Sequence, residues 1–105
     1  MIIGLFVVAV IVLFVLALPL VFPTLLIDSV GYALRWRPDD FKGWTFYGEL
    51  FMRKEMLEHA LYALKTSIKI YPNYPRAWQS LGDVLFRMGD LEGAKTAYGF
   101  AEDSL

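Results

Sequence analysis

The chain contains no cysteine and only one histidine in 105 residues, and it has no ionisable side chain between Met1 and Ile27. The lack of cysteine excludes disulfides and thiolate metal sites. A formal net charge of −1 gives no electrostatic support for a nucleic-acid partner. All ten Lys/Arg and all eleven Asp/Glu residues lie at Asp28 or later, so the sequence divides into an apolar leader and a charged remainder.

The leader predicts a transmembrane helix over residues 1–23. Its apolar run, residues 2–22, is long enough at about 1.5 Å per residue to cross a hydrocarbon core of about 30 Å. It is too long for a signal peptide and lacks the basic residues that precede one. We therefore expect a single-pass integral membrane protein with an N-terminal anchor. Arg35, Arg37 and Lys42 follow the run, which favours a cytoplasmic location for the remainder.

The remainder contains an internal repeat in two consecutive copies. Residues 38–71 align with residues 72–105, and eight positions are identical, where chance gives about two. The identical pairs are Pro38/Pro72, Trp44/Trp78, Gly48/Gly82, Arg53/Arg87, Leu57/Leu91, Glu58/Glu92, Ala60/Ala94 and Ala63/Ala97.

These residues resemble the tetratricopeptide repeat family, whose pattern is W-x2-L-G-x2-Y, then A-x3-F, then P. The first copy reads WTFYGELF, ALYAL and then proline, and the second reads WQSLGDVL and AKTAY. The resemblance implies an all-α fold, in which the membrane helix leads into a short α-solenoid of about two and a half helix-turn-helix repeats. The residues that carry the signature are Trp44, Gly48, Ala60, Pro72, Trp78, Leu81, Gly82 and Ala94.

The spacing also predicts the helices of each repeat. The first copy, repeat 1 at residues 38–71, should have one helix at 41–53, opened by Asp39 or Asp40, and a second at 55–71. Repeat 2, at residues 72–105, should begin its first helix at Pro75. Trp44, Tyr47, Gly48 and Phe51 share one helical face, and the small residues Gly48 and Ala60 allow close approach of the two helices.

Residues 24–37 have two interpretations. When the register of the repeat is extended backwards, Val30, Ala33 and Pro38 align with Leu64, Ser67 and Pro72, which indicates a half repeat stacked on repeat 1. The alternative is an amphipathic helix at a membrane interface, with Tyr32 and Trp36 in the headgroup region.

The residue inventory gives no support for catalysis. His59 is the only histidine, and a lone histidine on a helix is more often a solvated surface residue than a ligand. Asp39 and Asp40 are explained by helix capping. With no phosphate loop, nucleophile motif or metal-ligand spacing, we expect no enzyme activity, cofactor, metal or small-molecule substrate.

The resemblance implies a binding groove for protein partners, lined by first-helix side chains that face away from the second helix. In repeat 1 these are Lys42, Thr45, Phe46, Glu49, Met52 and Arg53, and in repeat 2 they are Arg76, Gln79, Ser80, Asp83, Phe86 and Arg87. A second contact is expected where the array ends, because the family stacks a further helix there. Its residues are Ala94, Tyr98, Ala101 and Leu105.

Two functions fit these features. The first is an accessory or structural subunit of a larger integral membrane complex, such as a membrane enzyme. The second is a membrane-tethered adaptor or assembly factor that recruits a soluble partner. The expected partners are other protein subunits, integral membrane subunits among them, together with the lipid bilayer.

Overall fold

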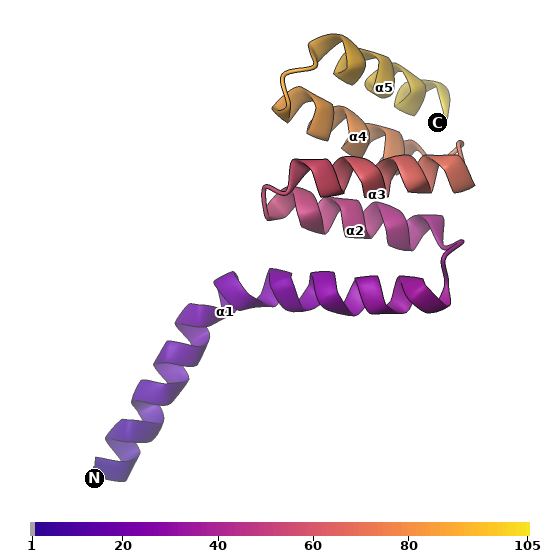
Figure 1. The fold of residues 1–105 in the computed structure, drawn as a ribbon. Coiled ribbons are helices and arrows are strands. Elements are labelled where there is room, and N and C mark those ends of the chain that lie inside the picture. The colour runs from indigo at the N-terminus through magenta and orange to yellow at the C-terminus, as the bar shows by residue number, and fades with distance from the viewer. Residues whose placement is uncertain (1) are drawn as a thin grey trace.

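The computed structural model describes residues 2–105, except for the side chains of residues 17–23. The described part of the chain is all-α and contains five helices (Figure 1). These are α1 (Ile2–Trp36), α2 (Phe41–Arg53), α3 (Leu57–Ile70), α4 (Pro75–Arg87) and α5 (Leu91–Asp103).

The helices form a short solenoid. Figure 1 shows two antiparallel pairs, α2 with α3 and α4 with α5, stacked one on the other, while the C-terminal half of α1 runs along α2. The N-terminal half of α1 leads away from the stack. The predicted solenoid of helix-turn-helix repeats is thereby confirmed. The contact between α1 and α2 is the one that a half repeat at residues 24–37 requires, and that assignment remains a prediction.

The predicted membrane helix at residues 1–23 is wrong. Among the described residues, no helix combines the length and the apolar character that crossing a bilayer demands. Part of the predicted span, at residues 17–23, lies outside the described side chains.

This finding overturns the expected single-pass membrane localisation with an N-terminal anchor and cytoplasmic repeats. The lipid bilayer and integral membrane subunits were expected as partners because of that span, and those expectations lose their basis with it.

The ends of the helices follow the predicted signals closely. Asp40 caps α2, since its carboxylate accepts a hydrogen bond of 3.1 Å from the backbone N–H of Gly43. Pro75 begins α4, as expected. The second helix of repeat 1 begins at Leu57, two residues later than predicted, because Glu55 adopts a left-handed conformation with φ of 60°.

The turn at Glu55 has its counterpart in repeat 2. Gly89 occupies the equivalent position with φ of 87°. In both turns the N–H of the following residue, Met56 or Asp90, donates to a carbonyl in the last turn of the preceding helix at 2.9 Å. Glycine adopts this conformation without penalty and glutamate does not, so the first repeat carries backbone strain that the second avoids.

The two signature tryptophans make the same hydrogen bond in their repeats. The indole N–H of Trp44 donates to the carbonyl of Pro38 at 2.8 Å, and that of Trp78 donates to Pro72 at 2.6 Å. Each bond ties the first helix of a repeat to the loop that precedes it. This shared bond gives the tryptophan of both copies the same structural role.

The two glycines of the signature lie where side chains of the facing helix leave no room for a Cβ atom. A Cβ atom on Gly48 would lie 2.7 Å from Cγ of Leu64, and one on Gly82 would lie 2.6 Å from Cε1 of Tyr98. Any larger residue would force these side chains aside. The core beside these contacts consists of Ile27, Leu50, Phe51, Ala60, Leu64, Leu81, Val84 and Ala97.

We predict opposite effects of one substitution at two glycines of repeat 2. Gly82→Ala should lower the free energy of unfolding by about 1 kcal/mol, because overpacking outweighs the gain in helix propensity. Gly99→Ala should raise it by about 0.5–1 kcal/mol, since a Cβ there meets open space inside α5. Urea denaturation followed by circular dichroism measures both. Equal effects at the two positions would show that the close approach at Gly82 is absent.

Candidate functional site

The predicted groove residues fall into three classes of exposure. Thr45 and Ser80 are buried and do not line an open surface. Their burial places them between helices, and the Thr45 hydroxyl lies 2.7 Å from that of Ser67 in α3. Glu49, Met52 and Asp83 are half-buried, whereas the exposed members are Lys42, Phe46, Arg53, Arg76, Gln79, Phe86 and Arg87.

Several of the groove charges bind each other across the two repeats. The Arg76 guanidinium donates two hydrogen bonds, of 2.8 and 2.7 Å, to the carboxylate of Glu49. The Ser80 hydroxyl donates a third at 3.0 Å. The hydrogen bond to Glu49 and the charge of that carboxylate raise the pKa of Arg76. This cluster joins α2 to α4 and fixes side chains that the sequence had assigned to partner binding.

Arg87 forms a second link between the repeats. Its guanidinium donates at 3.3 Å both to the backbone carbonyl of Met52 and to the carboxylate of Glu55. The strained turn after α2 is therefore held by a side chain from α4.

The four residues expected at the end of the array do not form one uniform face. Ala94 is buried, Tyr98 and Ala101 are half-buried, and Leu105 is 96% exposed. Tyr98 packs over Gly82 and donates a hydrogen bond to the Asp83 carboxylate. Tyr98 is thus used inside its own repeat, and the predicted contact with another polypeptide remains a prediction.

The surface around Tyr98 has two shallow hollows, of about 500 and 290 Å³. Lys95 and Glu102 line the first. Their counterparts in repeat 1, Leu61 and Ile68, pack against the core. Repeat 2 therefore has charged residues at two positions that are apolar in repeat 1, where the next helix pair covers them.

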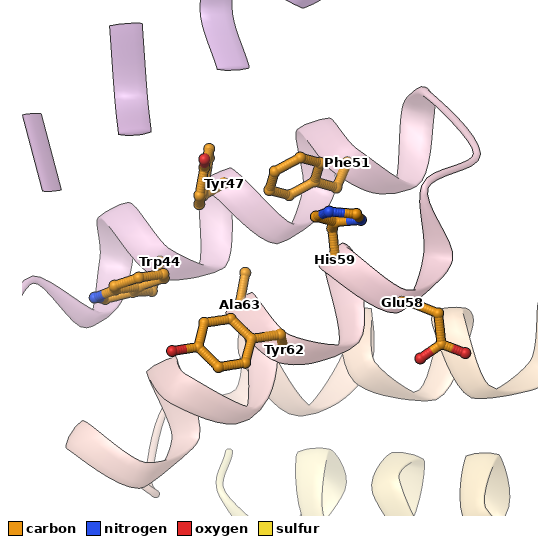
Figure 2. A pocket seen from close by; sticks show the side chains of 7 residues that line it. All are labelled: Trp44, Tyr47, Phe51, Glu58, His59, Tyr62 and Ala63. Carbon is orange, nitrogen blue, oxygen red and sulfur yellow. The ribbon is translucent and has the colours of Figure 1, made fainter. Parts of the chain in front are cut away.

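A further pocket, which we call the aromatic pocket, lies between α2 and α3 and has a volume of about 420 Å³. Figure 2 shows side chains from both helices around it, with Glu58 at its edge beside His59. Trp44 and Tyr47 are half-buried, while His59 and Tyr62 are exposed. The residues that line it are Trp44, Tyr47, Phe51, Glu58, His59, Tyr62 and Ala63.

The rings of the aromatic pocket contact one another in a continuous series. The centroids of Tyr62 and Trp44 lie 6.2 Å apart, and those of Trp44 and Tyr47 lie 6.0 Å apart. Phe51 continues the series, with its centroid 4.5 Å from that of Tyr47 and 5.1 Å from that of His59. Edge-on and tilted contacts of this kind hold the rings in place while leaving ring surface toward the hollow.

Sequence reasoning missed this pocket because it placed Trp44, Tyr47 and Phe51 on one helical face without separating a packed face from an open one. Only Phe51 is buried. A comparison of the two repeats would have found it, since the aromatic residues of repeat 1 are not repeated. Trp44 alone has an aromatic counterpart, and the others, Tyr47, Phe51, His59 and Tyr62, are replaced by Leu81, Leu85, Gly93 and Thr96.

The side chains at these sites are suited to contact with another molecule. Within the described residues, no group of three or more His, Asp or Glu side chains could hold a metal ion. The surfaces offer apolar rings, paired charges and hydrogen-bonding side chains, which suit recognition of another molecule.

Comparison with known proteins agrees with this geometry. A family model described as tetratricopeptide repeat matches residues 63–96, which include all of α4. A crystal structure of MamA has a TM-score of 0.71 at 22% identity, covering 74% of this chain and 46% of its own. MamA from Desulfovibrio magneticus RS-1, from residue 41 to its end, has a TM-score of 0.76 at 18% identity, with coverages of 84% and 50%.

This chain therefore spans about half the length of the solved structures that it matches. At these identities the likeness establishes the fold alone. No curated protein matches the sequence.

We predict that Glu49 and Arg76 are energetically coupled. A double-mutant cycle with Glu49→Gln and Arg76→Gln should give a coupling energy of about 0.5–1 kcal/mol, because the pair is partly exposed and makes two parallel hydrogen bonds. The coupling should weaken in molar salt. A coupling energy of zero at low salt would contradict the cross-repeat contact.

A second prediction concerns Tyr98. Its hydrogen bond to Asp83, with a smaller effect of burial, raises the pKa of Tyr98 to about 12 from the usual 10. Only the neutral phenol donates this bond, so its contribution to stability should be complete below pH 10 and lost as the pH rises through about 12. The measurement is the difference in unfolding free energy between the natural chain and Tyr98→Phe as a function of pH.

Asp83→Asn provides the control, because it removes the carboxylate that accepts the bond. In that variant the pKa of Tyr98 should fall toward its ordinary value, as read from the ionisation spectrum of tyrosine. If the stability difference stayed constant through pH 12, the bond would not be the cause.

Proposed function

We propose that this chain, which belongs to the tetratricopeptide repeat family, is a non-catalytic module that binds another protein along the surface of α2 and α4. The observation that carries the proposal is the exposure of two phenylalanines, Phe46 on α2, beside α1, and Phe86 on α4, beside α5. Phe46 is 39% exposed and Phe86 is 61% exposed. Aromatic residues among fixed charges are the usual anchors of protein interfaces.

The groove charges support this role by keeping the anchors in place. Glu49, Arg76 and Ser80 form one bonded cluster between the two helices that carry Phe46 and Phe86. A partner then meets a surface that is already ordered, and little side-chain entropy is lost on binding.

Within this role, a lasting subunit of a larger protein assembly is the form that we favour. Residues 2–16 of α1 include a long series of exposed large apolar side chains. Apolar surface of that extent is stable only against other apolar surface. We propose that another polypeptide of the assembly covers the apolar surface of residues 2–16.

An adaptor that binds a partner and then releases it is the second candidate. It is favoured by the use of Glu49, Arg76, Asp83 and Arg87 in bonds within the chain, which leaves fewer charged groups for a partner. Native mass measurement of the purified material separates the two forms. A fixed stoichiometry with other chains supports the subunit, and sub-stoichiometric association supports the adaptor.

We predict that a photo-crosslinking residue at position 46 or 86 gives covalent adducts with one and the same partner protein in cells. Tyr32 is the control position, because its exposure of 62% matches that of Phe86 and it lies on α1, outside the groove. The same adduct at positions 46 and 86, and none at position 32, is the expected result. Equal adducts at all three positions would count against the groove.

With that partner purified, Phe86→Ala should raise the dissociation constant about fivefold or more, as for an anchor residue. An unchanged dissociation constant would show that Phe86 does not contribute to binding.

A further inference from the structure

We propose that the aromatic pocket binds a lysine or arginine side chain of a protein partner. This contact adds to the groove proposed above and does not depend on it. The argument rests on where the pocket lies, which of its residues the fold requires, and the chemistry of its lining.

The aromatic pocket and the groove lie on opposite sides of α2. At 100° per residue, Trp44, Tyr47 and Phe51 share one side of the helix, and the groove residues Phe46 and Glu49 lie on the other. Figure 2 shows Phe51 beside His59 of α3, whereas the Tyr47 ring points away from α3, and its hydroxyl would lie 2.8 Å from a Cβ on Gly31 of α1. A ligand in the pocket therefore leaves the groove accessible.

Two rings of the aromatic pocket, those of His59 and Tyr62, are not required by the fold, since repeat 2 has Gly93 and Thr96 at the same positions and forms the same helix pair. Trp44 and Phe51 also serve the fold, through the bond to Pro38 and through the core.

In repeat 2, Phe100 also stacks on Trp78, with ring centroids 4.6 Å apart. Its counterpart beside Trp44 is Thr66, whose hydroxyl bonds to the backbone at 2.8 Å and supplies no ring.

Repeat 1 therefore has rings around the hollow that repeat 2 lacks. It has no counterpart of Phe100, the ring that stacks on Trp78 in repeat 2. Two exposed rings that the fold does not require, His59 and Tyr62, stand beside a hollow, and such rings are better explained by a ligand than by stability.

The lining is complementary to a cation on an apolar stem. Its rings present electron-rich faces, which attract an ammonium or guanidinium group. The seven described lining residues include one carboxylate, Glu58, and no lysine or arginine. The buried Phe51 and Ala63 give apolar contact for the methylene groups that carry such a charge. This charge balance selects a basic side chain over an acidic one.

The proposal can be tested without knowing the partner. The probes are short Gly-Ser peptides with one central residue, which is arginine, its neutral isostere citrulline, or leucine. The full chain is isotopically labelled and kept in a non-ionic detergent because of the exposed apolar residues of α1. The signal is the indole N–H resonance of Trp44, and the indole of Trp78 in repeat 2 is an internal control.

The arginine peptide should shift the Trp44 resonance in a saturable manner at millimolar concentrations and leave that of Trp78 unchanged. The citrulline peptide should bind about two- to fivefold more weakly, as the loss of a cation–π contact at a partly exposed site implies. The leucine peptide should also bind more weakly than the arginine peptide.

Tyr62→Thr, which installs the residue of repeat 2, should weaken arginine-peptide binding by about the same factor. Tyr62 is 68% exposed, so this variant should keep its fold, and an unchanged Trp78 resonance verifies it. Tyr32→Thr is the matched control, since Tyr32 is 62% exposed and outside the pocket. It should leave peptide binding unchanged.

Several results would overturn the proposal. These are the lack of a saturable shift at Trp44, equal binding of the arginine and citrulline peptides, tighter binding of the leucine peptide, or full binding by Tyr62→Thr. A failure of the crosslinking at Phe46 and Phe86 would disprove the proposed groove and leave the peptide result intact. The two proposals are therefore tested separately.

Discussion

The closeness of the two helices within each repeat is the constraint on which the rest of the structure depends. Gly48 and Gly82 have no side chain where the facing helix supplies Leu64 or Tyr98. The paired helices pack closely there, and the buried core forms beside the contact. In repeat 1 the aromatic pocket lies between the same two helices.

The periodic residues allowed most of the solenoid to be predicted from the sequence. Tryptophan, glycine and proline recur at the same positions in both copies. Each is tied to one local feature, such as a hydrogen bond, a close helix contact or a helix end, so the pattern is easy to interpret. Asp40 and Pro75 were predicted correctly as the start of their helices for the same reason. The predicted membrane span was wrong, because no helix of the described residues has the length and the apolar character that crossing a bilayer demands.

The candidate sites were harder to predict because they depend on relations between repeats. The bonds from Arg76 to Glu49 join residues 27 positions apart, and no local spacing indicates that they meet. The aromatic pocket escaped notice for another reason. The spacing of Trp44, Tyr47 and Phe51 is the same for a core face as for an open hollow, and only the packing around them decides which it is.

The two arginines of α4 have a consequence for how the molecule unfolds. Arg76 binds near the middle of α2 and Arg87 binds the turn that follows it, so α4 holds the first repeat at two separated points. In a linear array, such nearest-neighbour terms decide whether units melt singly or together. Here they favour melting as one cooperative unit. A binding surface that spans both repeats is therefore formed or lost in a single unfolding transition.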